Sequence, residues 1–268
     1  MLHVENLSCG YGRTTVVSAV TFEVARGEVV VMLGPNGAGK TTLFRTLLGL
    51  QRPLGGTVTI DGTPLGARNG SRSIAYVPQS HVASFSFTVA DVVTMGRTPL
   101  LGRFATPSQA DRRAALAELD QLGLAHLADR DYTRISGGEQ QMVLVARALA
   151  QQAPIVMMDE PASSLDLGNQ ARLLSTVRSL ARERSIAVVL STHNPDHAFL
   201  VADRALLVQN GSARFGSVDD ICERDALVAA YDTPLRLLEG EPDAQGRRPR
   251  ACQILLDDSP TTLQGEHS

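Results

Sequence analysis

A glycine-rich segment near the N-terminus has the residue types and spacing of a phosphate-binding loop. The pattern G-x-x-x-x-G-K-[ST] is matched in full by Gly34-Pro35-Asn36-Gly37-Ala38-Gly39-Lys40-Thr41, and Thr42 follows it. Glycines let the backbone approach a phosphate, and the N–H groups of such a loop form an anion-binding nest at the start of a helix. Lys40 supplies a positive charge for the β- and γ-phosphates, and the Thr41 hydroxyl is a ligand for Mg²⁺. The segment predicts a site for a nucleoside triphosphate and Mg²⁺.

An acidic pair, Asp159 and Glu160, directly follows the apolar run at residues 155–158. A carboxylate at the carboxyl end of a buried parallel strand lies where α/β sheets bind their ligands. We expect Asp159 to hold Mg²⁺ through water. We expect Glu160 to act on the attacking water as a general base, which is typically worth about 10²–10⁴-fold in rate. The pair is a weak motif by itself, but together with the glycine-rich loop it indicates hydrolysis of the triphosphate.

The elements that must hold these residues are visible as alternating strand and helix patterns. Runs of β-branched and apolar residues predict strands at residues 2–7, 16–24, 28–33, 57–60, 73–77, 155–158, 186–191 and 205–208. Several later runs are unbroken, as in parallel strands that are covered on both faces, whereas the early ones alternate and predict an antiparallel layer. The fold class is therefore α/β: a P-loop NTPase core with a mixed, mostly parallel sheet and an antiparallel β layer.

Helical periodicity replaces the strand signals between residues 84 and 134. Helices are expected at 88–96, 108–122 and 124–128, which predicts an α-helical subdomain inserted at about 84–134 into a domain that spans 1–230. Residues 231–268 form a C-terminal extension. Within it, residues 235–239 and 251–256 are expected to pair as a hairpin, and the tail from residue 257 is expected to fray.

A third motif stands between the glycine-rich loop and the acidic pair: Ile135-Ser136-Gly137-Gly138-Glu139-Gln140-Gln141. It resembles the signature of the ATP-binding-cassette (ABC) transporter family, which usually reads Leu-Ser-Gly-Gly-Gln. Other elements of that family occur in the expected order, and the resemblance covers roughly residues 1–230, the predicted ABC ATPase domain. It implies ATP and Mg²⁺ as cofactors, and the fold and enzymatic activity of an ABC ATPase.

Four single residues gain a role from this resemblance. It implies that Tyr11 stacks on adenine and that Gln79 senses Mg²⁺ and water. It also implies that Asp166 belongs to the D-loop at the nucleotide, and that His193 steadies the γ-phosphate and the attacking water. Taken singly, each has a plainer interpretation: a turn tyrosine, a strand-end glutamine, a helix N-cap aspartate and a loop histidine. Their joint order around an intact phosphate loop favours the nucleotide-binding roles.

The family also implies a homodimer that holds two ATP molecules between its subunits. The phosphate loop of one copy then faces the signature of the other, so that Ser136, Gly137, Gly138 and Glu139 lie at the ATP held by the partner. The signature departs from the family pattern at Ile135 and at Glu139, which brings an anion near a triphosphate. Because the stretch from Ser136 to Glu139 is also an S-x-x-E capping box, we expect the capping role of Glu139 to dominate.

Composition limits the partners and the location of the chain. The net charge is −3, from 25 basic and 28 acidic residues, so no attraction to nucleic acid is expected. No run reaches the about 20 apolar residues of a transmembrane helix, and the first five residues lack the character of a signal peptide. We expect a cytoplasmic protein, peripheral on the cytoplasmic face of the bacterial inner membrane. The family resemblance implies that it binds two integral-membrane permease subunits there and, indirectly, an exported solute-binding protein.

The stretch at residues 87–97 resembles the cassettes of metal-chelate importers, which take up iron–siderophore, haem, cobalamin or related oxyanions such as molybdate. The expected function is therefore the ATP-hydrolysing subunit of such an importer. The expected dock for the permease lies near residues 85–97, among Phe87, Val89, Val93 and Met95.

Other functions remain as alternatives. An exporter is the nearest rival, because the ATPase core does not set the direction of transport. A soluble, non-transport cassette ATPase is disfavoured by the single cassette and by the three widely spaced cysteines, which lack metal-ligand spacing. A module that holds ATP without hydrolysing it is disfavoured by the intact Lys40, Glu160 and His193.

Overall fold

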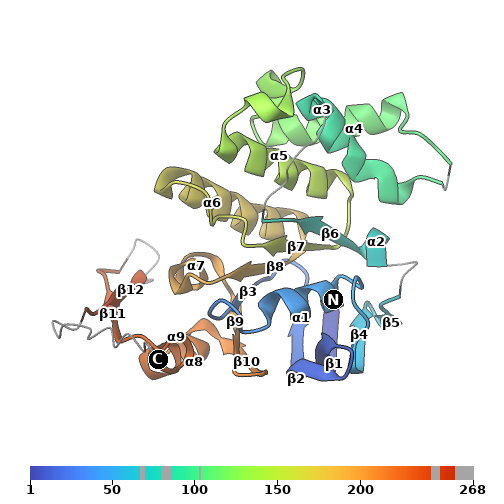
Figure 1. Cartoon of the computed structure of the whole chain (residues 1–268). Helices are drawn as coiled ribbons and strands as arrows, with labels where there is room; N and C mark the ends of the chain where they lie inside the picture. The colour runs from blue at the N-terminus through green and yellow to red at the C-terminus, as the bar shows by residue number, and fades with distance from the viewer. Residues whose placement is uncertain (67–69, 80–85, 103, 243–247, 257–268) are drawn as a thin grey trace, which may run out of the picture.

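The computed structural model describes residues 1–66, 70–79, 86–102, 104–242 and 248–256. Two sheets form its centre (Figure 1): a six-stranded sheet in the order β10-β9-β3-β8-β7-β6, and a four-stranded antiparallel sheet in the order β2-β1-β4-β5. In the six-stranded sheet all neighbouring strands are parallel except β10, which runs antiparallel to β9. The predicted α/β class, with its antiparallel layer, is confirmed.

The strands of the six-stranded sheet are β3 (Val29–Leu33), β6 (Ile74–Val77), β7 (Ile155–Asp159), β8 (Ala187–Thr192), β9 (Arg204–Gln209) and β10 (Ser212–Ser217). Those of the antiparallel sheet are β1 (Leu2–Tyr11), β2 (Thr14–Val24), β4 (Gly55–Ile60) and β5 (Thr63–Pro64). The sequence patterns identified these strands apart from β5 and β10. The segment of β10 is small and polar, and it holds its place by pairing along β9.

The helices that pack on the two sheets are α1 (Lys40–Leu47), α2 (Gly70–Ser73), α5 (Gly137–Ala150), α6 (Leu167–Arg184), α7 (Pro195–Val201), α8 (Val218–Ile221) and α9 (Arg224–Tyr231). The segment from Val218 to Tyr231 forms two short helices. The break follows α8, where Cys222 leaves the helical conformation, and Glu223 begins the next helix.

A helical group covers one end of the molecule, above the central sheet in the view of Figure 1. It contains α3 (Val89–Thr94), the 3₁₀ segments η1 (Met95–Leu100), η2 (Ala125–Leu127) and η3 (Tyr132–Arg134), and α4 (Gln109–Gln121). Capping boxes start α3 at Thr88 and α4 at Ser108, since each N-cap hydroxyl accepts from the N–H of an aspartate three residues on. The prediction of an inserted α-helical subdomain is confirmed. Its expected first residues, 84 and 85, lie outside the described part of the chain.

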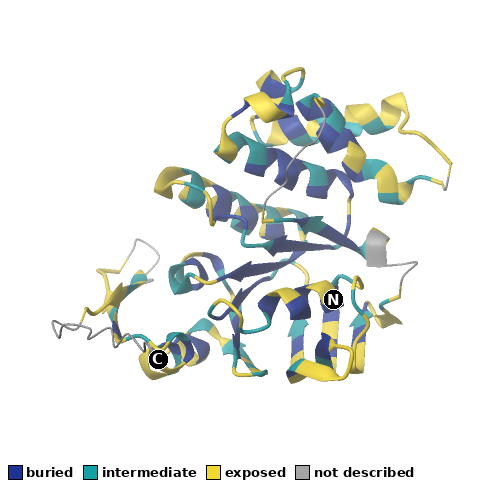
Figure 2. Cartoon of the chain, in the orientation of Figure 1, coloured by how far each residue is buried: buried dark blue, intermediate teal, exposed yellow. Residues whose placement is uncertain are grey.

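The core lies on both faces of the six-stranded sheet, which is the dark blue centre of Figure 2. Because side chains alternate along a strand, β3 sends Val29, Val31 and Leu33 to one face and Val30 and Met32 to the other. The first face packs against α5, α6 and the helical group, and the second against α1 and the antiparallel layer. These strands are unbroken apolar runs because both faces of the six-stranded sheet are covered.

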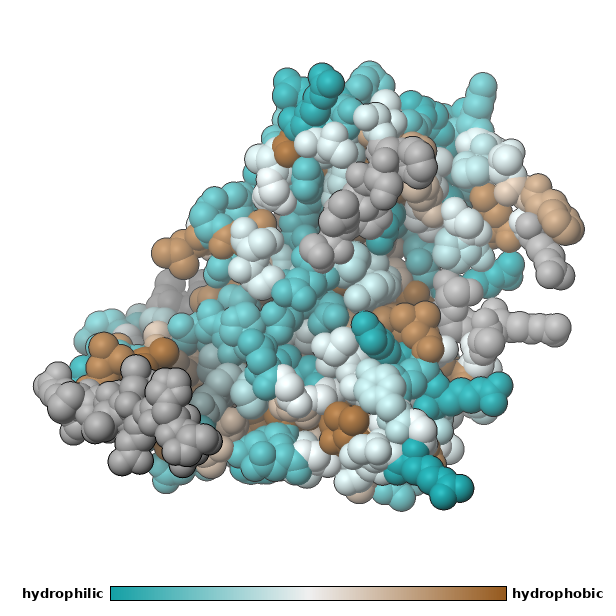
Figure 3. Space-filling view, viewed as in Figure 1, coloured by the Kyte–Doolittle hydropathy of each residue, from teal (hydrophilic) through white to brown (hydrophobic). Residues whose placement is uncertain are grey.

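The C-terminal hairpin, β11 (Leu235–Glu239) and β12 (Arg250–Ile254), forms a separate two-stranded sheet. It lies away from the antiparallel layer and beside α7 in Figure 1. The hairpin exposes the apolar side chains of Leu238 and Ile254. Figure 3 shows brown, hydrophobic residues over this part of the molecule. The hairpin was expected, whereas the tail from residue 257 lies outside the described residues. The division into residues 1–230 and 231–268 stays a prediction.

Candidate functional site

The glycine-rich loop, residues 34–41, leaves the end of β3 and turns into α1, which begins at Lys40. We call it the P-loop. Gly34 has φ 152°, and a Cβ there would lie 2.3 Å from the carbonyl oxygen of Val208. Gly39 has φ 99° and packs against β2. Only glycine fits at these two positions, which explains the spacing of the motif.

Lys40, the only lysine in the chain, is 6% exposed. Its Nζ donates to the carbonyl oxygens of Gly34 at 2.7 Å and Pro35 at 3.0 Å, and lies 3.8 Å from Oε1 of Glu160. Burial lowers the pKa of Lys40, while the nearby carboxylates of Glu160 and Asp159 oppose that shift. The structure therefore brings the lysine of the P-loop and the acidic pair together in one cluster of charged side chains.

The acidic pair is held by the next strand. Ser191 of β8 donates its hydroxyl to Oδ1 of Asp159 at 2.6 Å and accepts from the backbone N–H of Glu160 at 3.1 Å. Glu160 adopts φ 43°, a left-handed conformation that is uncommon for a residue with a Cβ and typical of functional turns. His193 lies on the other side, with its Nδ1 3.0 Å from Oε2 of Glu160. The Glu160 carboxylate thus lies between a lysine and a histidine.

Two further predicted residues border this site. Nε2 of Gln79 donates to the hydroxyl of Ser163 at 3.4 Å, and that hydroxyl donates to the carbonyl oxygen of Glu160 at 3.0 Å. Tyr11 is 54% exposed, and its hydroxyl lies 3.4 Å from Oγ1 of Thr42 at the start of α1. An exposed ring beside the P-loop offers a stacking face.

The signature residues form a second cluster, at the N-terminus of α5. Ser136 is the N-cap: its hydroxyl accepts from the N–H of Glu139, and the Glu139 carboxylate accepts from the N–H of Ser136 at 2.8 Å. The Ser136 hydroxyl, which donates to Oε2 of Glu139 at 2.7 Å, and the Ser136 N–H together lower the pKa of Glu139. The predicted capping box is therefore present.

The same cluster includes the predicted D-loop residue. A Cβ on Gly138 would lie 2.7 Å from the side chain of Asn169, whose Nδ2 donates to Asp166 at 2.8 Å. Asp166 caps α6 by accepting from the N–H of Asn169. The plainer role of Asp166, an N-cap, is thus present, and it places the signature and the D-loop side by side.

The fold and the P-loop with its acidic pair define a nucleoside-triphosphate-hydrolysing protein of the α/β P-loop class. The ABC transporter family model matches residues 17–163, more than half of the chain. The chain belongs to the ABC transporter family, as an ATP-hydrolysing, ATP-binding subunit. It is part of a transporter complex, although no helix in the described ranges is long and apolar enough to cross a membrane.

Individual relatives and solved structures belong to the same family. The chain is 36% identical to the molybdate import ATP-binding protein MolC of Haemophilus influenzae, over 87% of this chain and 89% of that protein. It is 37% identical to the hemin import ATP-binding protein HmuV of Rhodococcus jostii, over 89% and 82%. A metal-chelate type ABC transporter in an inward-facing conformation matches with a TM-score of 0.85 and 33% identity, over 95% and 97%. A bacterial ABC transporter cassette solved as a dimer matches with a TM-score of 0.68 and 26% identity, over 81% and 99%.

Three residues of the site were not found from the sequence: Ser163, Asn169 and Ser191. Each joins segments that are far apart along the chain or caps another residue, and none belongs to a spaced motif. A small polar residue at the buried end of a strand, as at Ser191, was the one available signal.

Proposed function

We propose that this ATPase powers the import of a metal chelate or a related oxyanion such as molybdate across the bacterial inner membrane. The observation that carries the proposal is its likeness, along nearly the whole chain, to subunits named for molybdate and hemin import. The match in fold to a metal-chelate type transporter supports it. An exporter is the second candidate, because nothing in the ATP site distinguishes the direction of transport.

We assign the ATP site to the P-loop and its neighbours. The backbone N–H groups of residues 36–42 and the ammonium of Lys40 bind the phosphates, and the exposed ring of Tyr11 stacks on adenine. The ammonium can leave the carbonyl oxygens of Gly34 and Pro35 for phosphate oxygens, which gives it a charged partner in their place.

Mg²⁺ fits the oxygen donors that lie around this site. Thr41 offers a hydroxyl, Asp159 a carboxylate, and Gln79 an amide oxygen, since its Nε2 is already used toward Ser163. Among the described residues no group of three or more His, Cys, Asp or Glu could cage a metal, which suits an ion held mainly by phosphates and water. When bound, Mg²⁺ neutralises charge on the transferred phosphoryl group.

For hydrolysis we assign the general base to Glu160. Its carboxylate accepts a proton from the attacking water, and His193, 3.0 Å away, orients that carboxylate and contacts the γ-phosphate. Ser191 fixes the peptide of Glu160 and the carboxylate of Asp159 in one arrangement, so little reorganisation accompanies the reaction.

The second cluster then acts in a homodimer. Ser136, Gly137, Gly138 and Glu139 lie at the N-terminal end of α5, remote in sequence from the P-loop. The N–H groups of Ser136 and Glu139 serve the capping box, so we assign those of Gly137 and Gly138 to an anion at the helix N-terminus. We propose that they contact the ATP of the partner subunit, with Asp166 beside them. The dimeric cassette among the similar structures supports this arrangement.

Two substitutions in the signature test the proposed contact between the signature and the ATP of the partner subunit. Ser136→Arg is expected to lower ATP hydrolysis by about 10²-fold or more, because the bulky side chain blocks the partner's γ-phosphate and removes a stabilising donor. Glu139→Gln is expected to stay within about threefold of the wild type, because Gln also completes a capping box. Steady-state ATPase assays of the purified transporter measure both. A large loss with Glu139→Gln would show that the charge, not the cap, is required.

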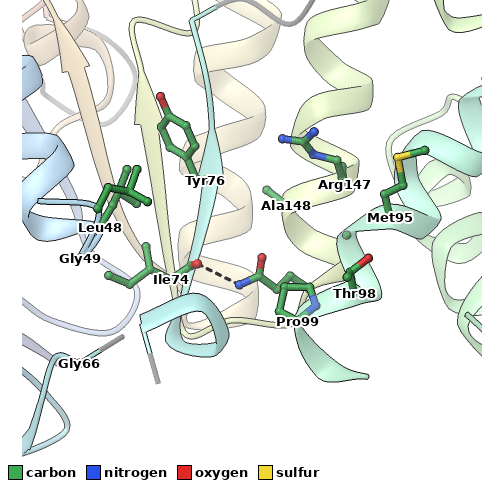
Figure 4. A pocket seen from close by; sticks show the side chains of 13 residues that line it. Leu48, Gly49, Gly66, Ile74, Tyr76, Met95, Thr98, Pro99, Arg147 and Ala148 are labelled. Atoms are coloured by element: carbon green, nitrogen blue, oxygen red, sulfur yellow. Dashed lines mark hydrogen bonds between the residues drawn. The ribbon is translucent and has the colours of Figure 1, made fainter. Parts of the chain in front are cut away.

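The expected permease dock is wrong at two of its residues. Val89 and Val93 are fully buried in the helical group, so they cannot contact a permease, whereas Phe87 and Met95 are each 39% exposed. Met95 borders two hollows. One, of about 430 Å³, is lined by Phe87, Asp91 and Arg112. The other, of about 460 Å³, lies between β6 and the helical group (Figure 4).

The larger hollow has a chemistry that suits a short helix. Apolar walls come from Leu48, Ile74 and Met95, and Arg147 of α5 points its guanidinium toward the space in Figure 4. Burial lowers the pKa of Arg147, and no carboxylate among the described residues pairs with it. We propose that the permease helix docks at these two hollows and presents apolar side chains and an acid to Arg147.

The uptake assay tests the dock and the importer proposal together. Met95→Asp is expected to lower solute uptake about tenfold while ATP hydrolysis of the purified complex stays within about twofold, because one hot-spot side chain is lost from the dock and the ATP site is untouched. Leu200→Asp, at an apolar position on α7 that is 53% exposed, is the control and should transport normally. Deletion of the gene should impair growth on limiting iron chelate, haem, cobalamin or molybdate. Normal uptake of all of them, with increased drug sensitivity, would favour the exporter instead.

A further inference from the structure

His193 has little packing to hold it. Its side chain is 49% exposed, and among the described residues the hydrogen-bonding partner of its ring is Glu160. Its position is therefore set by the backbone on either side. Residues 192–197, which we call the switch segment, are joined by hydrogen bonds around His193. The N–H of Asn194 donates to Oγ1 of Thr192 at 3.1 Å, and the N–H of Asp196 donates to Oδ1 of Asn194 at 3.0 Å.

The C-terminal hairpin continues this series of hydrogen bonds. The backbone N–H of Cys252 in β12 donates to Oδ1 of Asp196 at 2.7 Å. The register of the hairpin leaves that N–H available. The backbones of Gly240 and Pro249 bond to each other, as do those of Pro234 and Leu255, so the Leu237–Cys252 pair is a non-hydrogen-bonded one whose N–H groups point outward. The hairpin thus reaches Asp196, whose N–H donates to Asn194, the N-cap of α7.

Other contacts fix the hairpin on the same element. Leu235 is 4% exposed, and the guanidinium of Arg250 lies 4.7 Å from the ring centroid of Phe199 on α7 and pairs with Asp219. Thr233 and Ile254 line a cavity of about 510 Å³ together with Pro35, Asn36 and His193. The hairpin therefore lies against α7, and its Ile254 faces the P-loop and His193 across this cavity.

We propose that the C-terminal hairpin is part of the ATPase machinery: it holds the switch segment through the Cys252–Asp196 hydrogen bond, and Asp196 is a positioning residue for His193. The inference rests on the proposed role of His193 in hydrolysis. It gives a function to a segment outside the part matched by the family model. Loss of the hydrogen bond frees the first turn of α7, so that His193 spends less time against Glu160.

Two matched pairs of variants isolate this bond. Asp196→Ala removes the acceptor, whereas Asp196→Asn keeps an amide oxygen at the same place. Cys252→Pro removes the N–H, which an edge strand tolerates where that N–H points outward, whereas Cys252→Ala keeps it. Gln253→Ala, which alters the exposed pair with Arg236 on the hairpin, controls for general loosening of the hairpin.

We expect kcat for ATP hydrolysis to fall about tenfold in Asp196→Ala and in Cys252→Pro, with KM for ATP unchanged, because a small displacement of His193 weakens the transition state alone. Asp196→Asn, Cys252→Ala and Gln253→Ala should stay within about twofold of the wild type. Amide hydrogen exchange across residues 192–199 should become faster in the two damaging variants only.

A His193→Ala background separates this inference from the proposed function. If Asp196 acts through His193, Asp196→Ala should cause little further loss there. An undiminished loss, a wild-type kcat in both damaging variants, or an Asp196→Asn variant as weak as Asp196→Ala would overturn the inference. If His193→Ala alone hydrolyses ATP normally, the proposed role of His193 is wrong, whatever the exchange data show for the hairpin.

Discussion

Replacing Lys40 by alanine is expected to lower steady-state ATP hydrolysis by about 10²–10³-fold, the usual effect of removing one preorganised electrostatic stabiliser. Lys40 is the positive charge that the structure places at the P-loop, 3.8 Å from Glu160, and Arg45 further along α1 is exposed. Nucleotide binding should weaken as well, because the ammonium contacts phosphates in the ground state and in the transition state.

Folding has to be checked beside activity. The ammonium satisfies the carbonyl oxygens of Gly34 and Pro35, and a buried carbonyl left without a donor costs about 1–3 kcal/mol. Thermal unfolding and binding of a fluorescent ATP analogue should accompany the ATPase assay. Lys40→Arg, which keeps the charge but places a larger, planar guanidinium where the buried site holds a compact ammonium, should stay impaired. Near-normal turnover of a folded Lys40→Ala protein would remove the P-loop from the mechanism.

The second large effect is expected for Glu160→Gln. The amide keeps the shape of the side chain and its contact distance to His193, but it cannot accept the proton of water, so hydrolysis should fall about 10²–10⁴-fold while ATP still binds. ATP then remains in place, and the closed homodimer should persist. Size-exclusion chromatography with Mg-ATP should show a stable dimer for the variant and a transient one for the wild type.

A glutamate elsewhere on the surface provides the control. Glu183→Gln, at an exposed position near the end of α6, should leave both turnover and dimerisation unchanged. Turnover of Glu160→Gln at the wild-type rate would contradict its assignment as the base. Slow turnover without a dimer would keep Glu160 as the base and contradict the placement of the signature at the partner's ATP.

Much of the site could be predicted because its residues stand in motifs with fixed spacing. The P-loop needs glycine where φ is positive and the backbone passes close to β9, and Asp159 and Glu160 follow a strand that is buried on both faces. These are local requirements, and the sequence shows them directly. The capping box of Ser136 and Glu139 is local in the same sense.

The rest depends on contacts between distant segments. Ser191 bonds to Asp159 across two neighbouring strands, and the N–H of Cys252 meets Asp196 only because the hairpin folds back on α7. No periodic pattern in the sequence predicts such pairs. The dock for the permease shows the opposite error: Val89 and Val93 have the pattern of a surface helix, but the helical group turns them into its own core.

The arginine-rich make-up of the chain gives Lys40 a practical use. Because every other basic side chain outside the histidines is arginine, a protease specific for lysine has a single cleavage site in the whole sequence, inside the P-loop helix. Reagents for primary amines likewise have that buried ammonium as their one side-chain target in the sequence. One cut or one label therefore reports how often the P-loop opens, without any engineered tag.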